Sequence, residues 1–579
     1  AASDVYKRQL IVSFVSIWLV APAVALEASR PPKPKRQLSA SPEQNRALRQ
    51  IARETWRYFE TFVSPQEHML PPDNFQEDPK PTIAHRTSPT NIGLYLLAAV
   101  SARDFGWAGT RATATRLEQT FDTLATLTRW RGHFYNWYDT RSLQALEPAY
   151  VSSVDSGNFA GHLIALANAC DEWQDGVPSP MVRQGLQDTL RLARRALDDT
   201  ATPGSAHDTA IRSALDGMDR QLEGSRGIAA LAPAISHQAR KAAHAARTLQ
   251  PAESAADLVF WLEALANAAA EHASDIRTTA TAADTPDASP PLQANGPLAL
   301  RLQALAATAR KMAGSMDFAV LLDGQRKLLS IGLRPADHSL DENCYDLLAS
   351  EARLASLFAI AKGDAPTKHW FRLDRTAIPV GSGSALVSWS GSMFEYLMPS
   401  LVMRAPAGSL LEQTSRLAVQ RQMTYARALR LPWGISESSY NARDLSLTYQ
   451  YSNFGVPGLG LKRGLSDNWV IAPYATGLAT MVDLHAACRN FEHLATWGAR
   501  GRYGFYEALD FTPQRLPEGE TVAIVRSYMA HHQGMTIVAI GNALHDAQMR
   551  SRFHREPMIQ ACELLLQERV PRNLSLIHI

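Results

Sequence analysis

The chain has 579 residues, of which 46% are hydrophobic and 20% are charged, and its formal net charge is +2. This composition is typical of a globular protein with a large core, and the near-neutral charge excludes the basic footprint of a nucleic-acid-binding protein. The four cysteines lie far apart without metal-ligand spacing, which excludes a disulfide framework and a cysteine zinc site.

The two ends of the chain are unusual. Residues 1–9 and 574–579 are similar to translated sequencing-adaptor read-through, so we expect both to be non-native and the chain to be a piece of a longer protein. Residues 10–26 are apolar and have two interpretations, a secretory signal peptide or the C-terminal part of a transmembrane helix. Because the charges of the signal-peptide pattern, Lys7 and Arg8, belong to the non-native end, we favour the transmembrane helix.

A basic, Pro-rich linker is predicted over residues 27–42. Its positive charges between Arg30 and Arg36 follow the apolar segment directly. By the positive-inside rule, this places the rest of the chain on the cytoplasmic side of an inner membrane.

The first part of the main domain is predicted over residues 43–173. Ser41 followed by Pro42 is typical of a helix start, and apolar residues then recur at helical spacing. Ser88 and Pro89 predict the start of the next helix in the same way.

Residues 174–315 differ from their surroundings because they are rich in alanine and poor in aromatic residues. A Thr/Ala/Pro stretch over 274–297 divides two helical blocks. We expect a helical insertion with a structural or interdomain role and no functional site.

The second part of the main domain is predicted over residues 316–573. Two apolar runs around Asp323 and Gly324 predict a hairpin with a type I′ turn. A long helix is then expected from Asp341 to Gly363. Helices that alternate with polar loops predict a mainly α fold, an (α/α)6 toroid with a few short strands and a site at the inner-helix ends.

Four glutamates occur in apolar settings, where an unpaired carboxylate is costly: Glu351, Glu395, Glu437 and Glu507. On the expected helix, Glu351 shares the inward face with apolar neighbours, and burial raises the pKa of such a carboxyl group, as a general acid requires. The alternative is a structural Glu351 paired with Arg353 or Arg372.

Glu437 lies in a loop-like run of small polar residues that lets a substrate approach closely. Glycoside cleavage requires two carboxylates that flank one bond, and Glu351 and Glu437 form the best-placed pair. Glu395 and Glu507 have large apolar neighbours, which favours structural or supporting roles for them.

Aromatic and polar clusters predict a sugar-binding cleft, because aromatic rings stack on the apolar faces of sugars and polar groups bind the hydroxyls. Adjacent histidines do not predict zinc here, since no acidic partner lies four residues away, and neither a metal nor a cofactor is expected. The predicted substrate-binding residues are Arg86, Tyr135, Trp137, Tyr138, Asp139, Asp155, Asn158, Glu395, Tyr440, Asp444, Tyr451, Glu507, His531, His532 and Gln533.

Long motifs in one order over residues 45–572 carry a resemblance to a known family. These motifs are LPPDNFQED, AHRTSPTNIGL, RGHFYNWYDT, YVSSVDSGNFAGHL, YDLLASEARLAS, HWFRL, SWSGSMFEYLMP, WGISES, NARDLSLTYQYSNFGVPGLGLKRGL, GRYGFYEALDFTP and MAHHQGM. The chain resembles the central glycoamylase-like domain of cyclic β-1,2-glucan synthases.

The resemblance implies an (α/α)6 barrel that closes β-1,2-glucan rings by retaining transglycosylation. It also implies that Glu351 is the acid/base and Glu437 the nucleophile. Linear and cyclic β-1,2-glucan are the implied partners, and the parent chain is implied to carry a membrane-embedded glucosyltransferase and a phosphorylase-like domain.

Two other functions stay open at this point. A hydrolytic endo-β-1,2-glucanase could use the same barrel with an activated water. A non-catalytic domain that only holds the growing glucan is the third hypothesis, and the presence of both glutamates disfavours it.

Overall fold

A computed structural model describes Val15 and residues 18–22, 39–173, 178–200, 206–247, 249, 252–279, 296–381 and 383–569. Both predicted non-native ends, most of the predicted transmembrane helix 10–26 and most of the linker 27–42 lie outside these residues. Val15 and residues 18–22 are helical. Among the described residues, no helix is both long and apolar enough to cross a membrane.

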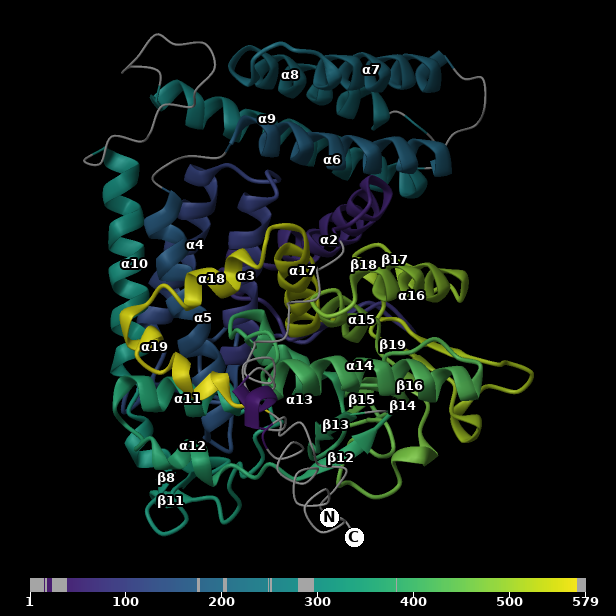
Figure 1. The fold of residues 1–579 in the computed structure, drawn as a ribbon. Coiled ribbons are helices and arrows are strands. Elements are labelled where there is room, and N and C mark those ends of the chain that lie inside the picture. Colours follow the sequence, from purple (N-terminus) through teal and green to yellow (C-terminus); the bar gives the residue numbers. More distant parts are fainter. Residues whose placement is uncertain are drawn as a thin grey trace, which may run out of the picture.

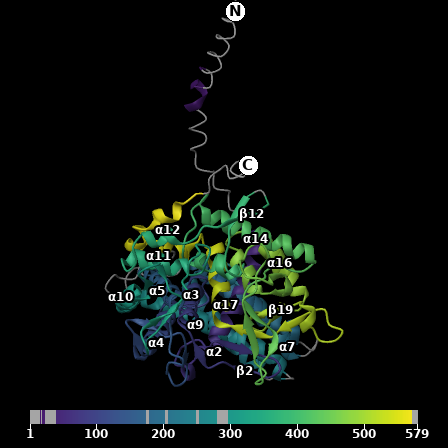
Figure 2. The same ribbon diagram turned by 90° about the horizontal axis from the view of Figure 1, so that it is seen from below.

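Within the described residues, helices alternate along the chain between an outer and an inner ring. The inner helices are almost completely buried. The ring closes because the last inner helix, α17, packs on the first, α3. This arrangement confirms the predicted (α/α)6 toroid, and Figure 2 shows α3 and α17 near its middle with α4, α10, α14 and α16 toward its edge.

The inner helices are α3 (Pro89–Asp104), α5 (Ser153–Glu172), α11 (Arg353–Lys362), α13 (Met393–Leu397), α15 (Pro473–Ala479) and α17 (Ala530–Leu544). The outer helices are α2 (Pro42–Phe62), α4 (Thr110–Thr126), α10 (Pro297–Ser315), α12 (Lys368–Arg372), α14 (Leu410–Leu429) and α16 (Leu484–Thr496). Two short helices, α18 (Gln548–Phe553) and α19 (Pro557–Gln560), follow the ring.

Local capping explains where the first helices begin. Ser41 caps α2 by accepting a hydrogen bond from the backbone N–H of Gln44, whose side chain accepts one from the N–H of Ser41 in return. Ser88 caps α3 through the N–H of Asn91. Both predicted helix starts are confirmed.

Short antiparallel strands join the helices and lead into the first turns of inner helices. For example, β21 pairs with β1 and is followed directly by α17, and β7 pairs with β10 and is followed by α5. The strands up to the insertion are β1 (Asn74–Gln76), β2 (Thr82–Ile83), β3 (Arg86–Thr87), β4 (Arg129–Trp130), β5 (His133–Phe134), β6 (Tyr138–Asp139) and β7 (Val151–Ser152). The later strands are β8 (Leu322–Asp323), β9 (Leu328–Leu329), β10 (Gly332–Arg334), β11 (Ser339–Leu340), β12 (Ala377–Val380), β13 (Gly383–Leu386), β14 (Ser438–Arg443), β15 (Tyr449–Ser452), β16 (Val470–Ile471), β17 (Arg500–Gly501), β18 (Gly504–Phe505), β19 (Ala508–Asp510), β20 (Ala523–Val525) and β21 (Ser527–Met529).

The hairpin predicted around Asp323 is present as β8 and β9, but its turn type was predicted wrongly. Asp323 Oδ1 accepts hydrogen bonds from the backbone N–H groups of Gln325 and Arg326. The left-handed residue is Lys327, with φ of 59°, so the loop is longer than the two-residue type I′ turn.

Helices α6 (Ser179–Thr200), α7 (Ala206–Glu223), α8 (Ile228–Ala246) and α9 (Ala252–Thr279) share a hydrophobic cluster of their own. They form the layer at the top of Figure 1. Buried Arg49 of α2 joins this layer to the ring by pairing with Asp188 at 2.7 Å. Helix α10 falls within the predicted insertion 174–315, yet its apolar face belongs to the main core; the domain boundaries themselves stay a prediction.

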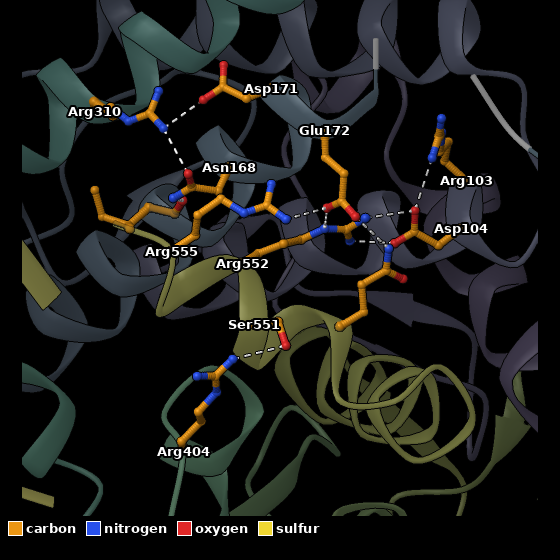
Figure 3. Close-up of polar contacts among 12 residues, drawn as sticks. Arg103, Asp104, Asn168, Asp171, Glu172, Arg310, Arg404, Ser551, Arg552 and Arg555 are labelled. Atoms are coloured by element: carbon orange, nitrogen blue, oxygen red, sulfur yellow. Dashed lines mark hydrogen bonds and ion pairs between the residues drawn. The ribbon is translucent and has the colours of Figure 1, made fainter. Parts of the chain in front are cut away.

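A buried ion network lies at the C-terminal ends of α3 and α5 (Figure 3). Arg552 of α18 binds Asp104 through both terminal nitrogens and Glu172 through Nε at 2.7 Å. Its side chain is almost fully buried. Since an unpaired buried charge is very costly, this network fixes α18 against the ends of two inner helices.

Candidate active site

Side chains from the first turns of the inner helices meet at one end of the ring. His531 Nδ1 at the start of α17 donates to Asn91 Oδ1 at the start of α3, at 3.1 Å. Thr90 then donates to Asp155 at the start of α5, at 2.5 Å. The N-terminal ends of α17, α3 and α5 are therefore adjacent.

The other inner helices meet the same end. Buried Arg353 at the start of α11 donates to the carbonyl of Tyr396 in α13, at 2.6 Å. Ser436 Oγ accepts from the N–H of Phe394 at the start of α13 and shares a 2.8 Å hydrogen bond with Tyr474 at the start of α15. Because the first turns meet around the whole ring, residues far apart in sequence converge there.

Glu351 lies at this end, but not on a helix as predicted. Helix α11 begins at Arg353, and the preceding residues form loop and bridge structure. Their backbone groups bond elsewhere: the N–H of Tyr345 donates to the carbonyl of Leu329, and the N–H of Leu348 donates to the carbonyl of Asp374. The predicted helix start at Asp341 was therefore wrong, whereas the predicted end at Gly363 is confirmed.

The structural alternative for Glu351 required an ion pair with arginine. Arg353 instead donates to the carbonyls of Ser350, Glu395 and Tyr396. Within the described part of the chain, no ion pair to Glu351 is found, and its carboxylate accepts only a long hydrogen bond from Ser350 Oγ, at 3.3 Å. A partly exposed carboxylate without a cationic partner is available for chemistry.

Glu437 lies in the loop before β14 and is held by two tyrosines. Tyr451 of β15 donates its hydroxyl to Glu437 Oε1 at 2.9 Å. Tyr474 donates to the backbone carbonyl of Glu437, also at 2.9 Å. The side-chain carboxylate is thus oriented by a phenol, and the backbone is fixed to an inner helix.

The electrostatics of the two carboxyl groups depend on one another. Burial, followed by the charge of Glu395, raises the pKa of Glu351 to about 7. Burial, followed by the charge of Glu351, raises the pKa of Glu437 to about 8. Such neighbours share one proton near neutral pH. The pKa of Glu437 stays the higher of the two although the Tyr451 hydroxyl lowers it, so the acid role of Glu351 rests on the family resemblance and not on these pKa values.

Glu395, predicted to bind substrate, has its carboxylate engaged by its own loop. Its two oxygens accept hydrogen bonds from the backbone N–H groups of Trp389, Ser390 and Ser392 and from the hydroxyls of Ser388 and Ser390. This corrects the prediction: Glu395 organises the start of α13 and acts on Glu351 through its charge.

Glu507 and His532 form a buried pair behind the tyrosines. Both side chains are about 1% exposed, and His532 Nδ1 lies 2.9 Å and 3.0 Å from the two oxygens of Glu507. The His532 ring stacks on Tyr474 with a centroid separation of 3.6 Å and an interplanar angle of 9°. Burial raises the pKa of Glu507 to about 8 and lowers the pKa of His532. The pair therefore supports the tyrosine that holds Glu437.

An aromatic and cationic wall continues from His531. Asn91 donates to Asp73 at 3.1 Å, and Asp73 accepts two hydrogen bonds from Arg86 at 3.1 and 3.2 Å. The guanidinium of Arg86 lies 4.9 Å from the ring centroid of Trp137. Arg86 and Trp137 are thereby connected to the histidines, as a common binding surface requires.

Other predicted binding residues lie close to this surface. Burial raises the pKa of Asp155, although Thr90 donates to its carboxylate. Asn158 is buried and its Oδ1 accepts no hydrogen bond in the described structure. Gln533 lines a small cavity with Glu507 and His532.

Four further predicted binding residues have other surroundings. Tyr138 is fully buried. Its hydroxyl donates to the carbonyl of Thr128 and accepts from the N–H of Tyr135. The ring of Tyr135 is partly buried and packs against the ring of Tyr138. Asp139 caps the turn after β6, and Asp444 caps the turn between β14 and β15. The burial of Tyr138 corrects the prediction for that residue, whereas substrate binding by Asp139 and Asp444 stays a prediction.

Tyr440 packs against the protein with its ring but keeps part of its surface accessible. Its ring packs edge-on against Phe454 at 5.4 Å and lies 5.0 Å from the guanidinium carbon of Arg515. It stays partly exposed.

Sequence reasoning missed Tyr474 and Trp389. Tyr474 follows Pro473 in the first turn of α15, and this Pro-led helix start was the available signal. Trp389 belongs to the loop around Glu395, and 48% of its surface is exposed. An exposed tryptophan beside the site is a candidate sugar platform.

Comparisons with known proteins relate the chain to a family and to solved structures. Residues 343–557 match the family model Glycoamylase, described as "Putative glucoamylase". Glu351, Glu395, Glu437, Glu507 and His532 all fall within the match. Residues 343–557 are thus similar to a glycoamylase-like domain. It is also 48% identical over its whole length to the cyclic beta-(1,2)-glucan synthase NdvB of Rhizobium meliloti, of which it spans 20%.

Solved structures show the fold of the glycoamylase-like domain. An endo-beta-1,2-glucanase from Chitinophaga pinensis, in complex with sophorotriose and glucose, is 12% identical with a TM-score of 0.55, over 91% of this chain and 99% of that chain. The endo-beta-1,2-glucanase of Talaromyces funiculosus, in complex with beta-1,2-glucan, is 10% identical with a TM-score of 0.56, over 92% and 91%. At such low identity, the likeness concerns the fold.

Proposed function

We propose that the chain cleaves and re-forms β-1,2-glucosidic bonds and closes linear β-1,2-glucan into rings by retaining transglycosylation. The observation that carries the proposal is the pair Glu351 and Glu437, two partly exposed carboxyl groups at the inner-helix ends whose charges act on one another. One protonated and one ionised carboxyl group are what a retaining mechanism uses.

In the first step, the Glu437 carboxylate attacks the anomeric carbon, and the glycosidic C–O bond breaks. Glu351 gives its proton to the departing oxygen, which leaves with the released part of the glucan. The products are a glycosyl ester on Glu437 and an ionised Glu351.

In the second step, a sugar hydroxyl attacks the anomeric carbon of the ester. Glu351 takes the proton of that hydroxyl, and the C–O bond to Glu437 breaks, which restores both groups. If the hydroxyl belongs to the far end of the same glucan, the product is a ring. If water attacks, the product is a shorter linear chain.

The 48% identity to a cyclic glucan synthase supports the choice of β-1,2-glucan and of ring closure. Product analysis on linear β-1,2-glucan tests it. Rings that resist exo-glucosidase support transglycosylation, and only shorter linear chains would make the domain a hydrolase. Binding without any product would leave a glucan-holding domain.

For the whole protein, we propose covalently linked glucosyltransferase and phosphorylase-like domains and an inner-membrane location with this domain on the cytoplasmic side. The basic residues after the apolar segment 10–26 support this orientation. A cysteine placed within residues 29–38 of the parent protein should react with a membrane-impermeant thiol reagent only from the cytoplasmic side. Labelling from the outside would contradict the orientation.

A further inference from the structure

A second cavity lies away from the two catalytic carboxylates, between the ring and the α6–α9 layer. Its volume is about 720 Å³, within the range of small-molecule sites. Arg195 of α6 and Trp261 of α9 line one side, and Glu54 of α2 and Arg502 of the β17–β18 hairpin line the other. Figure 1 shows α6, α2, β17 and β18 as neighbours.

Aromatic side chains form part of the cavity wall. Trp261 and Tyr506 contribute the edges of largely buried rings, and Phe75 of β1 is partly exposed there. The guanidinium carbon of Arg57 lies 5.1 Å from the Trp261 ring centroid. Apolar contacts next to polar groups suit a sugar, which has apolar ring faces and polar edges.

Each arginine in the wall is already paired with a carboxylate, and each carboxylate holds two of them. Arg195 and Arg500 both bind Glu54, at 2.7 Å and 2.8 Å. Arg57 and Arg502 both pair with Asp257, at 2.7 Å and 3.2 Å. An anionic ligand would therefore have to compete with existing carboxylates for every one of these arginines.

Two more wall carboxylates have no cationic partner. Among the described residues, no ion pair is found for Glu77 or Asp199. Glu77 accepts a hydrogen bond from the Tyr506 hydroxyl at 2.8 Å. Carboxylates without a cationic partner would repel an anion, but their remaining lone pairs accept hydrogen bonds from the hydroxyls of a neutral ligand.

We propose that this cavity binds a stretch of neutral oligosaccharide, a part of the glucan that lies outside the catalytic site. The proposal rests on the proposed function for the identity of the sugar. Tyr506 lines the cavity, and the next residue, Glu507, contacts His532 at the site, so one glucan chain could occupy both. The helical layer then supplies one wall of a binding site, which differs from the expectation that residues 174–315 hold no functional site.

The test uses the full chain with Glu351→Gln, which keeps the glucan intact, and calorimetric titration with linear β-1,2-glucan oligosaccharides too short to reach both sites. In that background, Asp199→Ala combined with Arg502→Ala removes polar groups at the cavity mouth. Both residues are exposed, so the fold should persist, and thermal unfolding checks this. Arg416→Ala is the matched control, since Arg416 is an exposed arginine with one ion pair to Glu412 on outer helix α14.

We expect two classes of binding site in the parent, and about a tenfold or greater loss of affinity for one class in the double variant, since several hydrogen bonds are removed. The control should bind like the parent. Unchanged binding by the folded double variant, or a single class of site with normal cleavage by the unsubstituted chain, would overturn the cavity proposal alone. If the Glu351→Gln protein bound no glucan and the unsubstituted chain cleaved none, both the cavity proposal and the proposed function would be overturned.

Discussion

Gly157 of α5 and Ala355 of α11 lie in direct backbone contact. A Cβ atom at position 157 would come within 2.2 Å of the Ala355 Cβ and 2.4 Å of its Cα. Only glycine allows this approach of two inner helices. Since Glu351 lies just before α11, the contact sets where this carboxylate stands relative to Asp155 at the start of α5.

Gly157→Ala should therefore displace the first turn of α11 and lower activity about 10²-fold, because a misplacement of about 1 Å is that costly. Gly161→Ala is the matched control, as a Cβ there would meet only the Leu354 side chain, at 3.1 Å or more. The measurement is the initial rate on linear glucan at equal amounts of folded protein. Equal rates for the two variants would show that this helix contact does not position Glu351.

Glu351→Gln and Glu437→Gln should each lower the rate by about 10²–10⁴, because both an acid and a nucleophile are needed. Glucan binding should persist. A substrate with an aryl leaving group, which needs no protonation, should restore the cleavage step to Glu351→Gln but not to Glu437→Gln. Glu518→Gln, at an exposed residue, serves as the control. Near-normal activity of Glu351→Gln or of Glu437→Gln would remove the substituted residue from the mechanism.

Tyr451→Phe should change the pH profile of kcat/KM. The Tyr451 hydroxyl lowers the pKa of Glu437 against burial, so its loss raises that pKa, and the acid limb should move to higher pH. We expect a shift of about one pH unit, since a hydrogen bond to a charged group contributes about 1.5 kcal/mol or more. Tyr425→Phe on α14 should leave the profile unchanged, and an unshifted limb in Tyr451→Phe would contradict this role.

Trp137→Ala should shift the products from rings toward linear chains, with cleavage less affected. Ring closure competes with water for the glycosyl ester, and a held chain end can reach effective molarities of about 10⁵ M. Removing the ring under Arg86 loosens that hold. The ratio of exo-glucosidase-resistant to linear products measures the effect, with Trp497→Ala, beyond outer helix α16, as control. If Trp137→Ala left the ratio of resistant to linear products unchanged, Trp137 would have a structural role only.

Arg552→Met should destabilise the protein by about 3 kcal/mol, because it leaves buried Asp104 with only the longer ion pair to Arg103, at 3.3 Å. Arg555→Met is the control: Arg555 is half exposed and 4.0 Å from Glu172, so the loss should be within about 0.5 kcal/mol. Urea unfolding measures both. Activity per folded molecule should be unchanged, because Asp104 and Glu172 are the last residues of α3 and α5, whereas Glu351 lies just before the first residue of α11.

Local sequence was sufficient to predict several helix starts and to single out four glutamates in apolar settings. Ser41 and Ser88 mark helix starts because a capping hydroxyl bonds only to backbone groups three residues away. Alternating helical segments predicted the toroid for a similar reason, since periodic apolar faces must be buried against one another. Glu351 and Glu437 stood out because charged groups are rare in apolar surroundings.

Tertiary structure decided what these residues contact. The segment before Glu351 is loop rather than helix because its backbone groups bond to Leu329 and Asp374, partners that periodicity cannot reveal. Likewise, Tyr474 reaches the Glu437 carbonyl only because the inner-helix ends converge. The raised pKa of Glu437 arises from burial and from the charge of Glu351, and both depend on distances between residues far apart in sequence. Short-range hydrogen bonds depend only on neighbouring residues, so the sequence predicts them. The desolvation of a carboxyl group and its Coulomb interaction with another charge arise only once the ring of helices has closed.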